Sequence, residues 1–450
     1  MRIHVEVLLV LVMFPLALAM SQGKSLTLDQ AVTIALERNL SIAQAQNNVA
    51  AAQSGVLSAY GTYLPSLSAS AGWSRYQNQQ PASTPINVGG YQLTSGTSGF
   101  SVNNSFRADL SLNYTIFDGF AREASFNKAT SGAVSAEQNS LRTRQAIVFQ
   151  VQSSFVNVLR NEQLVKVNEE NLRRDQRQLD RIVESNRVGA LSLADVYRQQ
   201  SQVASDELAL ITQQNSFDKS KADLLALIGL DVMDDYVISD PTISPEISQG
   251  TLDSTTTRYS NASQLTSRAL TARPDYKSAN ETLQSSESGV TVAKSNYMPS
   301  VNAFAGYGIS NPELKYINDN RSLSWGLNFR WSLFDGFATN QQVQTAEATR
   351  RTAEISLVQT ALNISVDVKK ALLDLDAARK QYDVSLKALV SATEDRKIAE
   401  ERYNLGAGTL LDLLVANANL VNAEAQKINA AYGFVVAKRN VDFVLGEITY

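Results

Sequence analysis

The sequence predicts a mainly α-helical protein that carries a few amphipathic β-strands and is built as an internal tandem duplication. The first observation behind this prediction is that Phe117-Asp118-Gly119-Phe120 recurs as Phe334-Asp335-Gly336-Phe337. The second is that residues 88–240 and 313–450 contain no proline, which disrupts helix interiors, so these tracts can hold long helices. The third is a strict alternation of apolar and polar residues in four short segments, which is typical of strands.

The duplication covers most of the chain. The repeated motif has an offset of 217 residues, from Gly119 to Gly336, and Val188-Gly189-Ala190 keeps the same offset to Leu405-Gly406-Ala407. Upstream, the offset between Tyr63-Leu64-Pro65-Ser66 and Tyr297-Met298-Pro299-Ser300 is 234 residues. One connection in the first copy is therefore longer than its counterpart.

These offsets divide the chain into repeats. We expect a first repeat at residues 20–230, a linker rich in Ser, Thr, Asp and Pro at 231–264, and a second repeat at 265–450. Each repeat should contain a helix, a β-hairpin, a long helix and a return helix.

The composition excludes several kinds of site. The chain has no cysteine, and its only histidine is His4. A mature chain that begins after His4 would lack thiolate and imidazole ligands for zinc or copper, and it would lack cysteine and histidine nucleophiles. We therefore expect no cofactor, no bound metal and no enzymatic activity. The net charge of −4 gives no reason to expect nucleic acid as a partner.

The first 19 residues have the pattern of a secretory signal peptide. Arg2 precedes an apolar run from Val5 to Leu18, and Ala17-Leu18-Ala19 fits a cleavage site. The alternative is a single membrane anchor, but a run of about 15 residues is shorter than the ~20 that a spanning helix needs. The sequence therefore favours a cleaved signal peptide at residues 1–19.

The alternating segments lie at residues 66–74, 106–116, 301–309 and 323–333. Each is about 9–11 residues long, which matches a tilted strand that crosses a bilayer. Aromatic side chains lie in or beside these segments, as in the girdle of an outer-membrane barrel. The predicted girdle residues are Trp73, Tyr114, Trp325 and Trp331. The alternative is a soluble sheet on a core, but long helical tracts, not further strands, adjoin every segment.

Four strands are too few to enclose a pore by themselves. Open sheet edges inside lipid would leave backbone groups unpaired, at a cost of several kcal/mol each. If the strands span the membrane, the chain must therefore share its barrel with copies of itself. Three copies would give twelve strands.

Two long helices are expected next to the strands. Residues from Phe120 to Asn186 contain no proline, and an apolar residue recurs every seven positions at Val151, Val158, Val165, Leu172 and Leu179. The second repeat has Val368, Leu375, Tyr382 and Leu389 at the matching positions. About 65 helical residues make a rod on the order of 100 Å. The alternative is an ordinary two-helix coiled coil without a channel, but the adjoining strands, duplicated in phase, favour a hollow helical barrel that continues the pore.

The turns between the long and return helices carry further signals. Gly189 and Gly406 are placed to end the long helices in left-handed caps. Ser192 and Thr409 read as N-caps of the return helices, followed three residues later by Asp195 and Asp412, so capping alone would explain both aspartates. Exposed apolar residues at the tips predict a docking surface. This surface comprises Val188, Gly189, Ala190, Leu191, Leu193, Leu405, Gly406, Ala407, Leu410 and Leu411.

The duplicated set of motifs, together with Ala272-Arg273-Pro274-Asp275, resembles outer-membrane efflux proteins of the TolC type over essentially the mature length. The resemblance implies a TolC-like trimer in outer-membrane lipid. Its twelve-stranded shared β-barrel, with four strands per chain, would continue into a long periplasmic α-helical barrel. The linker and the C-terminal residues would form an equatorial belt around the helices.

The resemblance also implies a gate and partners. Asp195 and Asp412 match acidic positions near the periplasmic constriction, and Tyr403 matches a tyrosine of the gate network. Gly408 and Val415 depart from the basic and acidic residues of some relatives, and Arg187 could supply a substitute charge. The expected partners are two further copies of the chain, a periplasmic adaptor (a membrane fusion protein) and an inner-membrane RND or ABC pump.

The sequence therefore predicts the outer-membrane channel of a tripartite efflux or type I secretion system, a passive duct for small molecules or proteins. One alternative is a non-conducting coiled-coil envelope protein with a barrel anchor. Another is an enzyme that uses a carboxylate pair such as Asp234-Asp235. That pair has no visible partner and fits a solvated loop.

Overall fold

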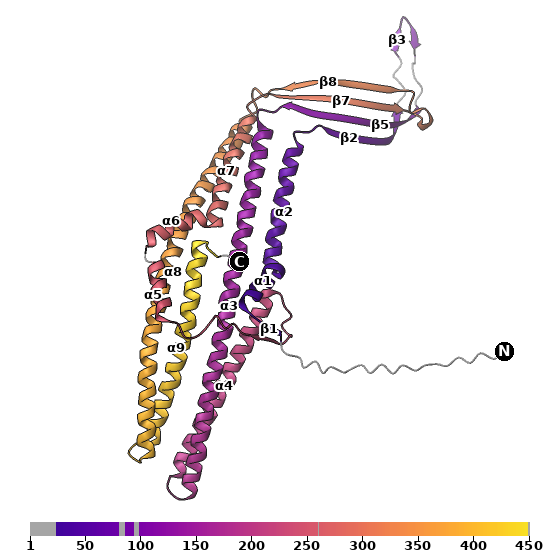
Figure 1. Cartoon of the computed structure of the whole chain (residues 1–450). Coiled ribbons are helices and arrows are strands. Elements are labelled where there is room, and N and C mark those ends of the chain that lie inside the picture. The colour runs from indigo at the N-terminus through magenta and orange to yellow at the C-terminus, as the bar shows by residue number, and fades with distance from the viewer. Residues whose placement is uncertain (1–23, 81–85, 94–98, 260, 449–450) are drawn as a thin grey trace, which may run out of the picture.

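The computed structural model describes residues 24–80, 86–93, 99–259 and 261–448, so the predicted signal peptide at 1–19 lies outside the described residues. These residues form a long rod of parallel and antiparallel helices. A four-stranded sheet projects sideways from one end of this rod (Figure 1). No helix in the described ranges has both the length and the apolar character needed to cross a membrane.

The helices of the two repeats match in length, which confirms the predicted duplication. The short entry helices have 11 residues, the next pair 22, the long pair 67 and the return pair 36. In the first repeat they are α1 (Leu28–Arg38), α2 (Leu40–Gly61), α3 (Ala121–Arg187) and α4 (Leu193–Ile228). In the second they are α6 (Ala262–Ala272), α7 (Pro274–Ser295), α8 (Ala338–Asn404) and α9 (Leu410–Leu445).

The long helices α3 and α8 run the whole length of the rod, about 100 Å at 1.5 Å per residue. The helix pairs α2 and α4 lie one after the other along α3, and α7 and α9 lie in the same way along α8 (Figure 1). The sequence placed the first long helix at Phe120 to Asn186, one residue from its observed bounds. A contact between α3 and α9 joins the two repeats in the half of the rod away from the sheet.

The predicted heptad seam holds only in the middle of α3. Val151, Val158 and Val165 are buried, whereas Leu172 and Leu179 are only half-buried. Below Val165 the buried positions become Asn171, Asp175, Gln178 and Ile182. A straight α-helix drifts by ~20° per heptad from a strict seven-residue repeat, so the buried stripe moves to other residues along so long a helix. The same change occurs in α8, where Leu389 is half-buried.

The sheet contains four antiparallel strands in the order β2-β5-β7-β8. They are β2 (Ser66–Gln80), β5 (Gly99–Phe117), β7 (Ser300–Asn311) and β8 (Arg321–Arg330), with a one-turn helix, η1 (Leu314–Tyr316), between β7 and β8. Most apolar side chains of β2, β5 and β8 are exposed, to 79% at Trp325 and 74% at Leu323, whereas most of those of β7 are half-buried. This sheet covers no core of its own chain, contrary to the soluble-sheet alternative.

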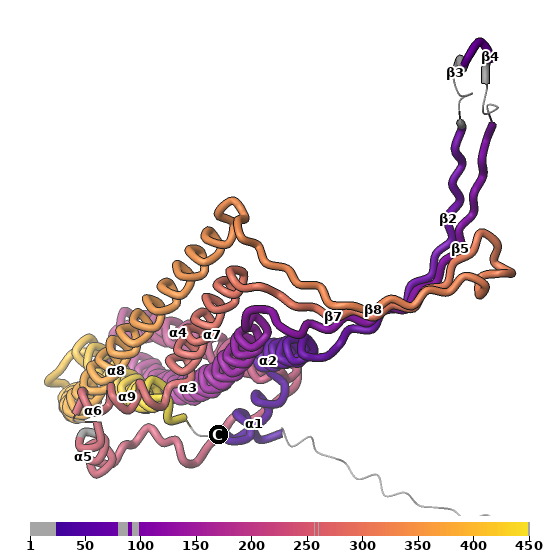
Figure 2. Tube along the Cα trace, turned by 90° about the horizontal axis from the view of Figure 1, so that it is seen from above, coloured from indigo at the N-terminus to yellow at the C-terminus, as the bar shows by residue number. Residues whose placement is uncertain are grey.

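Three predicted strand bounds are wrong. The strands β2 and β5 have 15 and 19 residues instead of about 9–11, because their pairing continues beyond Phe106, which pairs with the last residue of β7, Asn311. Residues 74–80 and 99–105 therefore form a two-stranded arm, and the small hairpin of β3 (Ile86–Val88) and β4 (Tyr91–Leu93) lies beyond it (Figure 2). Strand β8 ends at Arg330, not at Leu333, because its partner β7 begins only after Pro299.

The repeated Phe-Asp-Gly-Phe motif forms the junction between a strand and a long helix. Phe120 and Phe337 both adopt left-handed backbone conformations, with φ of 69° and 68°. Each ring packs edge to face on the first Phe of its motif, with centroids 5.6 Å apart. In each copy the Asp carboxylate accepts from the backbone N–H four residues later, at 3.2 Å in the first and 2.8 Å in the second. The motif therefore caps the long helix where the sheet meets the rod.

A belt of small elements crosses the middle of the rod (Figure 1). Strand β1 (Lys24–Leu26) pairs in parallel with β6 (Tyr236–Ile238), and the linker continues into α5 (Gln249–Arg258). Two apolar cores lie at this level. One joins α1, α3, α4, α9 and β6 around Phe155, and the other joins α5, α6, α8 and α9 around Phe434.

The Arg-Pro-Asp motif at residues 273–275 ties four helices together. The Arg273 guanidinium, 4% exposed, lies 2.6 Å from Asp275 and 3.2 Å from Asp367 of α8. Arg142 of α3 reaches the same Asp275 carboxylate at 3.8 Å and stacks 4.0 Å above the ring of Phe443 in α9. The motif thus holds α7 against α3, α8 and α9 at the level of the belt.

Candidate channel end and gate

The end of the rod away from the sheet, here called the distal end, consists of the two helix turns α3–α4 and α8–α9. Gly189 and Gly406 have φ of 81° and 72°, a conformation that strains other residues, so glycine is needed at both turns. In each turn the next N–H donates back to the helix, from Ala190 to Ser185 at 2.9 Å and from Ala407 to Arg402 at 2.8 Å. The two repeats therefore build the same turn.

Asp195 and Asp412 both serve as helix caps. Each backbone N–H donates to the preceding cap hydroxyl, Ser192 or Thr409, at 3.2 Å. Asp412 completes a capping box, since its carboxylate accepts from the Thr409 N–H at 3.0 Å. Hydrogen bonds from the Thr409 N–H and hydroxyl hold the pKa of Asp412 below its usual value. The pore role of the two aspartates stays a prediction.

Two other gate residues were predicted, Tyr403 and Arg187. In the structure Tyr403 lies near Asp195, whereas Arg187 does not. Tyr403 is half-buried, and burial together with the negative charge of Asp195 raises the pKa of its hydroxyl. That hydroxyl is buried without a hydrogen-bond partner among the described residues. Arg187 instead pairs with Glu184 of its own helix, with Nε 3.0 Å from Oε2. Asp195 takes Arg198 as its cation, at 3.0 Å.

The predicted docking surface is only partly exposed. Val188, Leu193, Leu405 and Leu411 are exposed, to 83% at Leu405, and so are the glycines and alanines of both turns. Leu410, however, is 3% exposed and belongs to a buried cluster with Ile182 and Val196. Leu191 is half-buried against the same cluster. The prediction that Leu410 and Leu191 form an exposed surface is therefore wrong, because both side chains turn inward between the helices.

Above the turns, the two repeats meet through polar contacts that the sequence analysis did not find. Arg181 of α3 lies 3.9 Å from Glu400 of α8, and Arg174 of α3 lies 3.7 Å from Glu424 of α9. The buried Asn417 amide of α9 donates to Asp175 of α3 at 3.4 Å. The sequence signal for these contacts is a polar residue at a buried position of a long helix, such as Asp175. It was not recognised because the buried positions depart from the seven-residue repeat in this part of α3.

The predicted aromatic girdle residues are all exposed. The sheet register places Trp73 opposite Phe106, and Phe106 opposite Asn311. Tyr114 lies opposite Ala303, eight residues along β7 from Asn311, which is about 26 Å at 3.3 Å per residue. Trp325 pairs with Ala305, two residues along β7 from Ala303, which is the partner of Tyr114. Trp331 follows the end of β8. Trp73 and Tyr114 thus lie about as far apart as the two borders of a membrane band ~25 Å tall.

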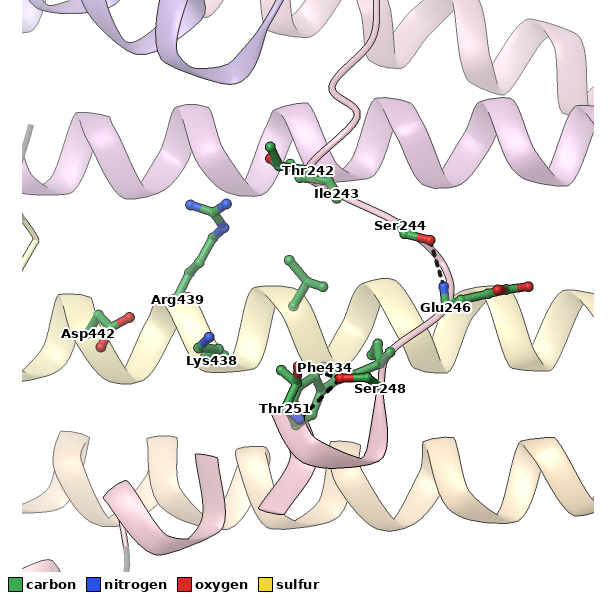
Figure 3. A pocket seen from close by; sticks show the side chains of 12 residues that line it. Thr242, Ile243, Ser244, Glu246, Ser248, Thr251, Phe434, Lys438, Arg439 and Asp442 are labelled. Atoms are coloured by element: carbon green, nitrogen blue, oxygen red, sulfur yellow. Dashed lines mark hydrogen bonds between the residues drawn. The ribbon is translucent and has the colours of Figure 1, made fainter. Parts of the chain in front are cut away.

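A cavity of about 460 Å³ lies between the linker and α9 (Figure 3). Lys438 and Arg439 line it, together with Glu246 and Asp442, so its charges balance. Burial lowers the pKa of Arg439, while Asp240 and Asp442 oppose this change. The balance favours neither an anion nor a cation. Within the described ranges, no three acidic or histidine side chains are grouped closely enough to hold a metal ion.

Each repeat supplies two strands and one set of helices, so the chain combines an elongated helical rod with one antiparallel sheet whose exposed apolar side chains resemble those of a lipid-facing barrel. This combination defines a class of membrane-anchored helical proteins. Residues 31–230 and 265–447 match the family described as "Outer membrane efflux protein", and the chain belongs to this family. The predicted family, the predicted location in the outer membrane and the predicted function as an outer-membrane efflux channel are thereby confirmed.

Individual relatives are distant but cover nearly the whole chain. Protein CyaE of Bordetella pertussis is 25% identical over 90% of this chain and 80% of its own length. The pyoverdine export outer membrane protein OpmQ of Pseudomonas aeruginosa is 22% identical over 88% and 80%. The crystal structure of the CmeC outer membrane channel of Campylobacter jejuni has a TM-score of 0.76 at 20% identity, over 93% and 85%. The fold is therefore that of this channel.

Proposed function

We propose that three copies of the chain form one continuous duct across the outer membrane and the periplasm. The observation that carries this proposal is the sheet, which exposes its apolar residues and has two unpaired edges, β2 and β8. Because the four strands alternate in direction, β8 of one copy meets β2 of the next in antiparallel orientation. Pairing these edges satisfies backbone groups that lipid cannot satisfy.

The number three follows from the size of the opening. Two copies would give eight strands, whose interior is filled by side chains, whereas twelve leave room for a passage. The helical part also offers surfaces for neighbours. Apolar side chains are exposed along α8 at Ile355, Val358 and Leu362, and along α4 at Leu208 and Ile211. Covering these residues in a ring of helices continues the duct.

The duct is passive, and its energy comes from a pump. Relatives are named for pyoverdine export and for toluene efflux, which supports export of small molecules. We assign the exposed tips, at Val188, Leu193, Leu405 and Leu411, as the docking surface for a periplasmic adaptor that links the duct to an inner-membrane RND or ABC pump. Asp195, Asp412 and Tyr403 form the gate at the distal end.

Native mass spectrometry in detergent and planar-bilayer recording test this proposal together. We expect a trimer with stable single-channel currents. Replacing Asp195 and Asp412 together by Ala should raise the conductance. It removes the carboxylate that accepts from the Thr409 N–H in the capping box and the carboxylate beside Tyr403, while the backbone caps from Ser192 and Thr409 remain. The double variant Asp218→Ala with Asp376→Ala removes two exposed carboxylates higher on α4 and α8 and serves as the control.

Two outcomes would contradict the proposal. A trimer without currents in any variant would favour a non-conducting envelope anchor. Unchanged conductance in the Asp195 and Asp412 double variant would leave the two residues as helix caps only.

A further inference from the structure

Two carboxylates face each other inside the distal half of the rod. Asp175 of α3 is 1% exposed and Asp206 of α4 is 7% exposed. Their side chains lie within hydrogen-bonding reach of each other. Buried acidic side chains are rare unless a cation pairs with them, so this pair calls for an explanation. It is buried within one copy of the chain, and neither the caps nor the tips use it.

The described residues supply no cation within ion-pair distance of either carboxylate. Asp175 Oδ1 accepts only from two amides, Gln199 Nε2 and Asn417 Nδ2, each at 3.4 Å. Asp206 Oδ1 accepts from Gln202 Nε2 at 3.0 Å, and its Oδ2 is buried without a donor. Asp206 Oδ2 therefore has no donor and lies beside a second carboxylate. A proton shared by the two groups would bind to this oxygen.

Two negative charges at such a distance in a poorly solvated site repel each other strongly, so one carboxyl group keeps its proton. Burial, followed by the hydrogen bond to Asp175 and the charge of Asp175, raises the pKa of Asp206 to about 7. The amides of Gln202 and Asn171 oppose this rise only in part.

We propose that a proton shared between Asp175 and Asp206 latches α3 to α4, and that its loss near neutral pH loosens the distal end of the channel. The proton converts a repulsion between the two helices into a hydrogen bond. The role in gating rests on the proposed channel function, whereas the latch itself is a property of one chain.

The pair lies at a junction of four helices, through which it can affect the distal end. Asn417 of α9 contacts Asp175 and accepts from Arg396 Nε of α8 at 3.0 Å. Arg396 in turn pairs with Glu400 at 2.9 Å, and Glu400 faces Arg181 of α3. Loss of the proton therefore weakens the α3–α4 contact where both repeats are joined.

Other charged groups on α3, α8 and α9 surround the junction. They are Arg174 and Arg181 on α3, Arg396 and Glu400 on α8, and Glu424 on α9, and each is matched with a partner of opposite charge. On α4, the neighbouring Glu207 is exposed and points away from the buried side.

The sign of the effect follows from the raised pKa of Asp206. A carboxyl group with a folded pKa above its unfolded value of 3.8 stabilises the folded contact fully below about pH 4, and this contribution is lost as the pH rises through about 7. If opening restores an ordinary pKa, the ratio of open to closed states of each subunit rises about tenfold between pH 6 and pH 8. Acid therefore closes the latch, and mild alkali releases it.

The test compares wild type with Asp206→Asn and with Glu207→Gln, which removes the adjacent exposed charge. Open probability in planar bilayers and the thermal midpoint of the trimer are measured at pH 6 and pH 8. We expect wild type and Glu207→Gln to open about tenfold more at pH 8 and to lose thermal stability there. Asp206→Asn keeps an amide donor at every pH, so both pH effects should disappear.

The two readouts separate the latch from the channel. If Asp206→Asn keeps the same change in thermal midpoint as wild type, the latch is wrong whether or not currents are seen. If that change disappears but open probability does not depend on pH in wild type, the pair holds the helices without gating, which also overturns the proposal as stated. If wild type gives no current at all, the channel function fails while the thermal comparison still decides on the shared proton.

Discussion

At the residue scale, Asp275 is a central contact of the fold, because its carboxylate pairs with two arginines, Arg273 and Arg142. Arg273 is almost fully buried, and Arg142 lies close enough for the two guanidinium groups to repel each other. Burial and this repulsion lower the pKa of Arg142 to about 10, although Asp275 opposes the change. We predict that Asp275→Asn lowers the free energy of unfolding by about 3 kcal/mol, because Arg142 loses its carboxylate partner and the buried Arg273 keeps only Asp367.

Chemical denaturation at pH 7 and at pH 3.5 measures this effect. Burial raises the pKa of Asp275, but Arg273 and Arg142 outweigh it, so the pKa lies below the usual value of 3.8. The stabilisation is therefore present above about pH 4 and is lost on acidification. The difference in the free energy of unfolding between wild type and the variant should therefore be smaller at pH 3.5 than at pH 7. Asp253→Asn breaks the exposed pair with Arg379 and should cost less than 1 kcal/mol. Equal losses in both variants would contradict the prediction.

The residue scale also separates what the sequence can predict from what it cannot. Asp195 and Asp412 were found because a cap is local, with the hydroxyl and the carboxylate three residues apart. Asp175 and Asp206 lie on different helices, and their pairing depends on how α3 and α4 pack. Leu410 was misplaced for the same reason, since only the neighbouring helices decide whether a tip leucine faces water.

At the element scale, the helices were predictable and the sheet bounds were not. Gly119 and Gly189 and the absence of proline between them indicate where α3 begins and ends, so its predicted bounds agree to within one residue. The helix α8 has the same length at the same repeat offset. The arm of β2 and β5 has no such signal. Apart from Tyr76, Phe100 and Val102, its side chains are polar or absent, so the alternation that marks a half-buried strand is too short to detect.

The arm leads to a prediction about assembly. The edge strand β8 begins at Arg321, on the same level of the sheet as Ala71, so a neighbouring copy of β8 cannot pair with the arm along most of its length. Arg75 pairs with Asn104 in the ladder, and an Asn-Gly turn can join them in place of residues 76–103. We expect this shortened chain to form trimers with the conductance of wild type, as measured by native mass spectrometry and bilayer recording.

A variant within the shared part of the sheet provides the contrast. Ser111→Pro places a residue without an N–H in the central strand β5, which pairs on both sides. This variant should fail to assemble. Loss of trimers in the shortened chain as well would mean that the arm takes part in the contact between copies.

At the scale of the whole molecule, the rod places its docking surface about 100 Å from the sheet, so the two ends can be altered independently. We predict that Val188→Glu with Leu405→Glu abolishes export, because both exposed side chains change from apolar to charged at the tips. Trimer formation and thermal stability should remain within the wild-type range, since neither side chain contributes to a core. Export in cells and adaptor capture by the purified trimer measure the effect.

Leu410 supplies the matched comparison for this prediction. It lies five residues from Leu405 but is buried with Ile182 and Val196, so Leu410→Glu should lower the thermal midpoint through the cost of a buried charge. The two variants thus separate loss of docking from loss of folding at the same end of the molecule. Full export by the Val188 and Leu405 double variant would mean that the adaptor binds elsewhere on the rod.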